Sequence, residues 1–320
     1  MTQRLRARFD GRRAVVAGLV AGVALAGITS VVPVDARAAE PAKAERIVSI
    51  GGAVTEILYA LGLSDRIVGV DSTSLYPPEA LATKANVGYM RQLSPEGLLS
   101  LNPTRIVAVE GSGPAGTLDV LREAKVPLVM IPDRFTEDGI VAKIRVVAHT
   151  MDADARGECL ASAVATDLTA MRALRDRIRD HRRVMFVMSL VDGRAMAAGR
   201  GTAADAIIAL AGGVNAIDGF DGYKTIGEEA IVAAKPDVVL AMQRGRDSIT
   251  AENVFASPAF MLTPAAKTKA FVTLDGLYLL GFGPRTASAA HDLAAALYPD
   301  VARADGVWTS HVAKADCRTP

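Results

Sequence analysis

Two short stretches of this chain hold residue types that could do chemistry. The first, "GSGPAG" at Gly111–Gly116, matches the glycine pattern that wraps the phosphates of a dinucleotide. It follows an expected strand and precedes an expected helix, and the next strand ends near Asp133, where a ribose-binding acid would stand. The second, "GYMRQLSPEG" at 88–97, places Tyr89 two residues before Arg91 and just ahead of a helix-start signal. The first stretch makes an exported nicotinamide-dependent oxidoreductase a rival hypothesis, which leaves Tyr89 unexplained.

The glycine pattern also fits a plain turn. It lies in the middle of its half of the chain, whereas the dinucleotide fingerprint usually follows the first strand. Pro114 stiffens the segment whose amides should face a pyrophosphate. The sequence suggests no Ser–His–Asp or Cys–His arrangement, and its histidines have no metal-ligand spacing. They are His149, His181, His291 and His311. We therefore expect no enzyme activity and retain the oxidoreductase as the alternative.

Short apolar strand candidates alternate with amphipathic helix candidates, which predicts an α/β fold with mostly parallel sheets. Strands are expected at 46–50, 66–70, 104–109, 126–131, 182–190, 236–242 and 269–274. Residues from about 153 to 181 contain no proline and carry apolar residues at helical spacing, which predicts one long rigid helix of about 40 Å. The expected division is an N-terminal lobe at 45–150, the connecting helix at 151–181, a C-terminal lobe at 182–300 and a tail at 301–320.

An internal repeat relates the two halves. Residues 226–242, "IGEEAIVAAKPDVVLAM", follow the pattern of 93–109 at an offset of 226 − 93 = 133. Glu96 then matches Glu229, and apolar residues fall on apolar residues. The earlier "TEILYALG" resembles "ADAIIALA" more loosely and in the same order, so duplication of a whole lobe explains the pattern better than chance. We expect two similar α/β lobes with a ligand cleft between them.

The N-terminus carries an export pattern. A cationic stretch, an apolar stretch and "ARA" at Ala36–Ala38 predict a signal peptide over residues 1–38, cleaved near Ala38. An uncleaved membrane anchor is the alternative, and Arg12–Arg13 is a weak sign of twin-arginine export. The protein is therefore expected in the periplasm. Its formal net charge of +1 argues against a nucleic-acid or anionic-membrane partner.

Cys159 and Cys317 are the two cysteines of the sequence. Export permits a disulfide, but Cys317 stands in a polar C-terminal stretch that the sequence cannot place near Cys159. We expect neither cysteine to have a structural role.

Five longer stretches resemble the substrate-binding proteins of bacterial ABC importers for haem, cobalamin and siderophores, and in particular the haemin-utilisation type. They are "GGAVTEILYALG", "VGYMRQLSPEGLLSLNP", "RAMAAGRGTAADAIIALAGG", "DGYKTIGEEAIVAAKPDVVL" and "DGLYLLGFGPRT". The resemblance covers about residues 45–300. It implies a monomeric class III periplasmic binding protein that captures haem b and delivers it to a dimeric inner-membrane permease with its ATPase, downstream of an outer-membrane haem receptor. Cobalamin or a ferric siderophore is the alternative ligand.

The resemblance implies that Tyr89 is the axial ligand of the haem iron. A phenolate is a hard anionic donor suited to ferric iron, and tyrosine does serve as a haem ligand. Free tyrosine titrates at about 10, so a neighbouring positive charge is needed to favour the phenolate. Arg91 lies on the same side as Tyr89 if the loop is extended, and we expect it to supply that charge. Without the resemblance, Tyr89 would be interpreted as a surface tyrosine in a turn.

In the second half, the resemblance implies that Lys224 and Arg244 pair with the haem propionates, although both also fit solvated surface charges. Tyr223 and Tyr278 either line the pocket or pack between the lobes. Some relatives carry a histidine that is a second iron ligand near residues 188–193, and this chain has none there. We therefore expect one haem with five-coordinate iron.

Two glutamates complete the expected sites. Glu96 and Glu229 each fall at the start of an expected helix, where the helix dipole mildly stabilises an acid. The resemblance implies instead that the pair, one on each lobe, docks on arginines of the dimeric permease.

Overall fold

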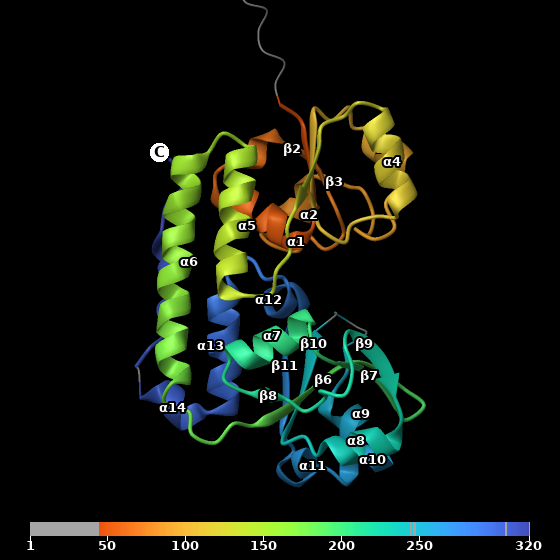
Figure 1. Cartoon of the computed structure of the whole chain (residues 1–320), viewed down its shortest axis with the longest axis vertical. Helices are drawn as coiled ribbons and strands as arrows, with labels where there is room; N and C mark the ends of the chain where they lie inside the picture. The colour runs from red at the N-terminus through yellow and green to blue at the C-terminus, as the bar shows by residue number, and fades with distance from the viewer. Residues whose placement is uncertain (1–44, 244, 246–247, 305, 320) are drawn as a thin grey trace, which may run out of the picture. The chain divides into compact units, whose positions relative to one another are not determined.

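The computed structural model describes residues 45–243, 245, 248–304 and 306–319. The expected signal peptide at 1–38 and Arg244 lie outside the described residues. The described chain forms an upper and a lower α/β lobe in Figure 1, each built on one sheet. We call the sheet of β1–β5 with its helices the first lobe, and the sheet of β6–β11 with its helices the second lobe. The predicted fold class is confirmed.

The sheet of the first lobe is parallel throughout, in the order β3-β2-β1-β4-β5. Its central strand reads IVSI with every side chain buried, because helices cover both faces of a parallel sheet. The strands are β1 (Ile47–Ile50), β2 (Ile67–Val70), β3 (Ala85–Asn86), β4 (Arg105–Val109) and β5 (Leu128–Ile131). The helices are α1 (Gly52–Ala60), the 3₁₀ turn η1 (Ser64–Arg66), α2 (Glu79–Thr83), α3 (Pro95–Leu99), α4 (Ala115–Glu123) and α5 (Glu137–Thr150).

The sheet of the second lobe has the order β11-β10-β6-β7-β9, and β8 pairs with β6. Strands β11, β10 and β6 are parallel, whereas β7 runs antiparallel to both of its neighbours. The strands are β6 (Arg183–Val191), β7 (Arg194–Ala198), β8 (Val214–Asn215), β9 (Tyr223–Ile226), β10 (Val238–Gln243) and β11 (Phe271–Asp275). The helices are α7 (Ala203–Leu210), α8 (Glu228–Ala234), α9 (Ala251–Phe255), α10 (Pro258–Met261), α11 (Pro264–Thr268), α12 (Gly276–Leu280) and α13 (Thr286–Leu297).

The internal repeat corresponds to the same elements in both lobes. Helix α3 begins at Pro95 and α8 at Glu228, which is 228 − 95 = 133 residues later. Strand β4 begins at Arg105 and β10 at Val238, again 133 residues apart. Strand β4 lies between β1 and β5, just as β10 lies between β6 and β11. The repeated sequence thus occupies the same place in each sheet.

Helix α6 (Asp154–Arg175) is the long helix between the lobes, and it packs on α5 of the first lobe and on α13 of the second (Figure 1). It ends before the expected residue 181, because the amides of Arg177 and Ile178 donate to carbonyls only three residues back and tighten the chain into a turn. Ile178 is buried, so the helical spacing of apolar residues continued beyond the helix itself. Neither α6 nor any other described helix has the length and hydropathy needed to cross a membrane.

A hydrogen bond from Lys143 and an ion pair between Arg285 and Glu56 join the lobes directly. Lys143 of α5 is fully buried, and its Nζ donates to Asp133 (2.5 Å) and to the carbonyl of Phe282 in the second lobe (3.0 Å). The guanidinium of Arg285 binds both carboxylate oxygens of Glu56, at 3.0 and 2.9 Å. One apolar core runs through both lobes beside these contacts. The arrangement restricts motion of one lobe against the other.

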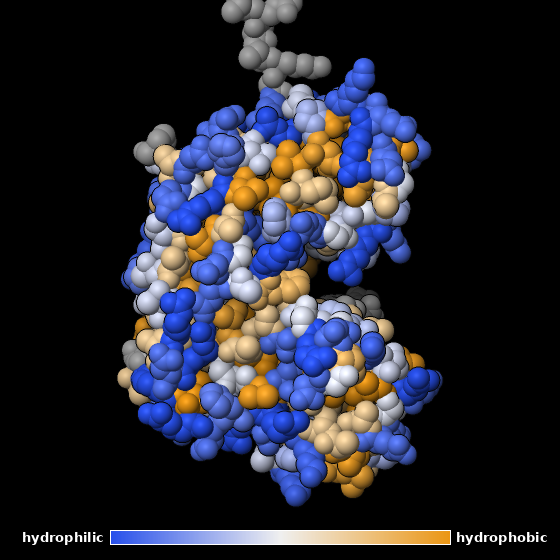
Figure 2. Space-filling view, viewed as in Figure 1, coloured by the Kyte–Doolittle hydropathy of each residue, from blue (hydrophilic) through white to orange (hydrophobic). Residues whose placement is uncertain are grey.

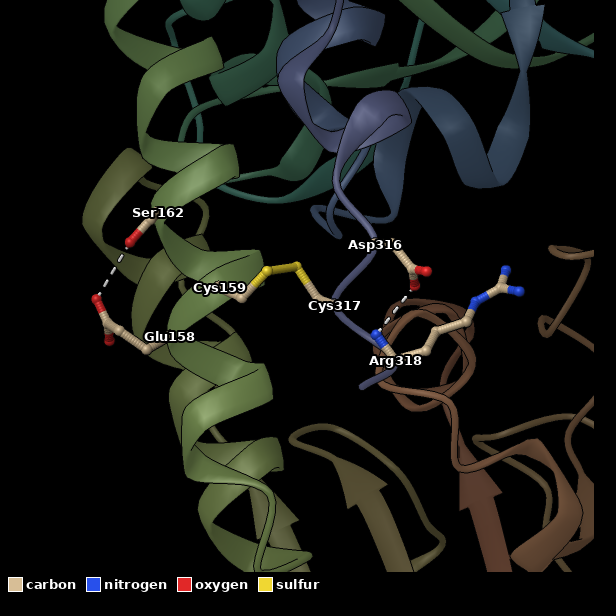
Figure 3. Close-up of a disulfide and its surroundings, with 6 residues drawn as sticks. All are labelled: Glu158, Cys159, Ser162, Asp316, Cys317 and Arg318. Atoms are coloured by element: carbon tan, nitrogen blue, oxygen red, sulfur yellow. Dashed lines mark hydrogen bonds between the residues drawn. A yellow bond between two sulfur atoms is a disulfide. The ribbon is translucent and has the colours of Figure 1, made fainter. Parts of the chain in front are cut away.

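The C-terminal stretch is part of the folded body. It contains α14 (Pro299–Arg303) and α15 (His311–Lys314), and the buried carboxylate of Asp167 in α6 accepts hydrogen bonds from the start of α15. Cys317 forms a disulfide with Cys159 of α6, with a Cα–Cα distance of 5.7 Å (Figure 3). The expectation that neither cysteine has a structural role is wrong, because α15 lies along α6 and brings Cys317 to it.

Candidate functional site

Tyr89 lies on the loop between β3 and α3, and 40% of its surface is exposed. Within the described part of the chain, its hydroxyl has no hydrogen-bond partner. The turn after β2 holds this loop from one side. The amide of Ser72 donates to the carbonyl of Gly88 (2.8 Å), and the amide of Val87 donates to Val70 (2.9 Å). The loop therefore presents a free phenol from an anchored backbone.

Gly88 gives the loop its shape immediately before Tyr89. Its φ is +90°, in the region that favours glycine. A Cβ added there would meet no atom within 4 Å, so the backbone conformation, and not a lack of space, requires glycine.

The glycine pattern at 111–116 holds the same loop from the other side. The amide of Gly113 donates to the carbonyl of Met90, and the amide of Leu93 donates to the carbonyl of Gly113, both at 2.9 Å. Asp133, the acid that would bind a ribose, is paired with Lys143 at 2.5 Å. The pattern acts in this structure as a turn that supports the Tyr89 loop.

Arg91 stands two residues after Tyr89 on the same loop. It is exposed, and the described side chains offer it no ion-pair partner within 4.0 Å. Burial raises the pKa of Tyr223, while hydrogen bonds from the Ala204 backbone and from Thr202 and the charge of Arg91 oppose that rise. The charge of Arg91, in the first lobe, thus acts on a tyrosine of the second lobe. The molecular surface is hollowed between the lobes on the side away from α6 (Figure 2).

Tyr223 and Lys224 are neighbours on β9, so their side chains point to opposite faces of the sheet. The ring of Tyr223 meets Phe186 edge-on, with 6.4 Å between centroids. The Nζ of Lys224 lies 5.1 Å from the ring centroid of Phe220. The side chains of Tyr223 and Lys224 thus start from opposite faces of β9 and have different neighbours.

Tyr278 lies apart from this group. Its hydroxyl donates to Asp292 (2.9 Å), and burial together with that carboxylate raises its pKa well above the usual value. It lines a cavity of about 690 Å³ with Glu56 and Arg285, and Tyr89 is not among the lining residues.

Glu96 and Glu229 occupy equivalent positions. Each is the second residue of its helix, α3 or α8, and each is exposed. The hydroxyl of Ser94 donates to the Glu96 carboxylate (2.8 Å) and, with the amide of Glu96 itself, lowers its pKa.

The segment 188–193 spans the end of β6 and the turn into β7. Among the described residues, no group of three or more His, Cys, Asp or Glu could hold a metal ion.

Sequence reasoning missed the turn 71–74, which anchors the Tyr89 loop. Its signal is "DSTS" directly after a buried strand. An acid followed by small hydroxyl residues is typical of turns built from side chain–backbone hydrogen bonds.

The known proteins that this chain resembles all belong to one class, the periplasmic binding proteins. The periplasmic binding protein family matches residues 47–278. The chain is 42% identical to the periplasmic haem-binding protein RhuT of Roseiflexus sp. RS-1, with a TM-score of 0.76 over 82% of this chain and 100% of that one. It is 38% identical to the periplasmic haem-binding protein BhuT, solved in complex with two haems, with a TM-score of 0.76 over 80% and 99% of the two chains.

Curated relatives are more distant. An uncharacterised ABC transporter substrate-binding lipoprotein of Bacillus subtilis, YvrC, is 26% identical over 80% of this chain and 81% of its own length. The vitamin B12-binding protein of Vibrio cholerae is 27% identical over 64% and 73%. The predicted resemblance to the haem, cobalamin and siderophore class is confirmed, and each protein named here is described as a binding protein.

Proposed function

The chain belongs to the periplasmic binding protein family, and from that premise we propose that it captures haem between its lobes and delivers it to an ABC permease. One observation carries the proposal. Tyr89 presents a phenol with no partner among the described residues, on a loop anchored from two sides. A phenol without a protein partner is open to a ligand, and ferric iron binds a phenolate well.

The charges around the loop suit this cargo. Arg91 is free of ion pairs among the described residues and stands two residues from Tyr89, where its charge favours the phenolate. Lys224 and Arg244 are the proposed partners of the propionates. Lys224 must reach around the edge of β9 to take that role, because its side chain starts from the face away from Tyr223. Tyr223 contributes a ring edge, and Tyr278 contributes packing between the lobes.

The proposal extends to location and partners. We infer that residues 1–38 direct export to the periplasm, and that the mature protein works there as a monomer on haem b passed on from an outer-membrane receptor system. Glu96 and Glu229 then contact a dimeric inner-membrane permease with its ATPase. The protein itself catalyses no reaction in this scheme.

Titration with hemin tests the proposal. Wild-type protein is expected to give a Soret band with a phenolate charge-transfer feature. Tyr89→Phe keeps the ring and removes the donor, so the charge-transfer feature should vanish. Tyr76→Phe is the matched control, because Tyr76 is a tyrosine of the same lobe with almost the same exposure, 41% against 40%. A Tyr89→Phe variant with the wild-type spectrum and affinity excludes Tyr89 as the ligand.

The same titration measures stoichiometry and tests other ligands. We expect saturation at about one haem per protein with high-spin five-coordinate iron, because Tyr89 has no histidine counterpart at 188–193. Saturation at two, the number bound in the BhuT structure, would contradict this part of the proposal. If the protein binds cobalamin, a ferric siderophore or a nicotinamide nucleotide tightly, and hemin produces no Soret change, then that molecule and not haem is the ligand.

A further inference from the structure

We propose that Asp71 is the positioning residue that sets the place of the iron ligand Tyr89, an inference that rests on the proposed function. Asp71 directly follows β2, at the carboxyl end of the strand, and is fully buried. It does not contact Tyr89. It acts through the turn 71–74, which is bonded to the Tyr89 loop.

The carboxylate of Asp71 accepts four hydrogen bonds. Its Oδ1 accepts from the amide of Gly51 (2.8 Å) and the hydroxyl of Ser74 (2.9 Å). Its Oδ2 accepts from the amide (2.9 Å) and the hydroxyl (2.7 Å) of Thr73. Three of these donors belong to the turn itself, so the carboxylate determines the course of the turn. A buried carboxylate is tolerated here because each oxygen is fully engaged.

The amide of Ser72, within that turn, points away from the Asp71 carboxylate and towards the Tyr89 loop. It donates to the carbonyl of Gly88 at 2.8 Å, and Tyr89 is the next residue. Asp71 thereby fixes the direction of the amide that holds the backbone just before the iron ligand. Iron–phenolate bonding is directional, so a small shift of this backbone alters the ligand geometry.

The Tyr89 loop has a second support that does not involve Asp71. The two hydrogen bonds between Gly113 and the residues Met90 and Leu93 hold the other side of the loop, and the hydroxyl of Thr117 donates to the carbonyl of Leu93 (2.9 Å). Loss of the Asp71 contacts should therefore displace Tyr89 rather than unfold the lobe.

Asp71→Asn tests the proposal with little change of volume. The amide keeps one acceptor oxygen, so two of the four donors lose their partner whichever way the side chain lies. We expect folded protein whose phenolate charge-transfer feature is weakened and shifted at saturating hemin, and whose hemin Kd rises by about tenfold or more. Asp119→Asn, at an exposed aspartate of α4, is the control and should match the wild type.

The spectral feature separates positioning from general stability, because a merely destabilised lobe would keep the wild-type spectrum in its folded fraction. Folded Asp71→Asn with the wild-type Kd and spectrum would falsify the positioning role. If Tyr89→Phe loses the feature in the same experiment, the proposed function stands and this inference alone fails. If Tyr89→Phe also matches the wild type, the ligand assignment itself is wrong.

A second pair of variants decides the matter if Asp71→Asn does not fold. Thr73→Val removes the hydroxyl donor to Oδ2 and leaves the carboxylate in place, whereas Thr73→Ser keeps that donor. We expect Thr73→Val to weaken the charge-transfer feature and Thr73→Ser to restore it. Identical spectra for Thr73→Val and the wild type overturn the proposal.

Discussion

At the scale of residues, Tyr89 and Tyr223 differ in what their phenols can do. Burial raises the pKa of Tyr223, with the charge of Arg91 only partly opposing it, so this phenol keeps its proton at neutral pH. The hydroxyl of Tyr89 has no protein partner among the described residues and is open to solvent. Tyr223 is thus suited to contact a porphyrin through its ring, and Tyr89 to coordinate the metal.

Arg91→Ala should raise the pH at which hemin coordination appears, because a positive charge two residues from Tyr89 is lost. Affinity at neutral pH should fall less than in Tyr89→Phe. A spectrophotometric pH titration of the hemin complex measures both. Arg122→Ala, on the exposed face of α4, is the control. A pH profile that does not move would remove Arg91 from this role.

The position of Tyr89 in a loop before α3 follows from its own sequence, because the helix start at 94–96 is a local signal. The position of Tyr89 relative to Tyr223 does not follow from the sequence, because it depends on how two distant lobes face each other. For the same reason, the cavity that contains Tyr278 could not be assigned from the sequence. Once β9 is known to be a strand, the sequence does predict that the side chains of Tyr223 and Lys224 point to opposite faces of the sheet.

At the scale of elements, helices α5 and α6 form the link between the lobes, and one carboxylate joins their ends. Glu137 stands in the first turn of α5, and Arg172 and Arg175 stand in the last turn of α6. Both arginines pair with Glu137, and the contact from Arg175 measures 2.8 Å. Partial burial raises the pKa of Glu137, but the two arginines outweigh it and hold the pKa below its ordinary value.

Glu137→Gln should lower the free energy of unfolding by about 1–3 kcal/mol at neutral pH, through the loss of charge-assisted hydrogen bonds. Because the folded-state pKa is depressed, the stabilisation is complete above the ordinary value of 4.5 and is lost as the pH falls through the folded-state pKa. Denaturant melts at several pH values should show the two proteins converging as the pH falls below 4.5 and through the depressed folded-state pKa of Glu137. Glu123→Gln, on α4, is the control. A constant difference at all pH values contradicts the assignment.

The elements that the sequence predicted are those with long apolar signals. Strands β1, β4, β6 and β10 are buried and β-branched, and the repeat gave the starts of α3 and α8. Strands β7 and β9 were not predicted, because they are short and partly exposed, and β9 reads "YKTI" with three exposed residues. Asp192 and Gly193, both with positive φ, form the tight turn between β6 and β7, whereas β9 pairs with β7 from a distant part of the sequence.

At the scale of the whole molecule, the disulfide joins residues 158 positions apart. The Cys159→Ala/Cys317→Ala variant should lose roughly 2–5 kcal/mol of unfolding free energy, because the unfolded chain is no longer constrained. Hemin affinity should be retained, since Tyr89 does not line the cavity beside Cys317. Thermal melts with and without reductant provide the check. The melting temperature of the reduced wild type should approach that of the variant, and the melting temperature of the variant should not change with reductant. Equal melting of oxidised and reduced wild type would count against the disulfide as a stabilising link.

The two lobes repeat one arrangement, and this symmetry bears on how the protein meets a dimeric partner. Glu96 and Glu229 are the second residues of equivalent helices, and both are exposed. The hydrogen bond from Ser94 lowers the pKa of Glu96, which keeps that carboxylate charged at neutral pH. If the glutamates only stabilised the helix dipoles, each helix could carry an acid or lack one independently of the other. Docking on a twofold partner instead needs one anchor on each lobe.

Glu96→Lys with Glu229→Lys should therefore leave hemin affinity unchanged and abolish stimulation of the permease ATPase and haem uptake in reconstituted vesicles. Exposed charges of this kind steer and orient docking without shaping the ligand site. Glu79→Lys with Glu252→Lys is the matched control, because it reverses one exposed glutamate on each lobe and changes the net charge by the same amount. If the control also abolishes transport, net charge rather than position is responsible. If the Glu96/Glu229 variant transports normally while folded and loaded with haem, the permease is contacted by other residues.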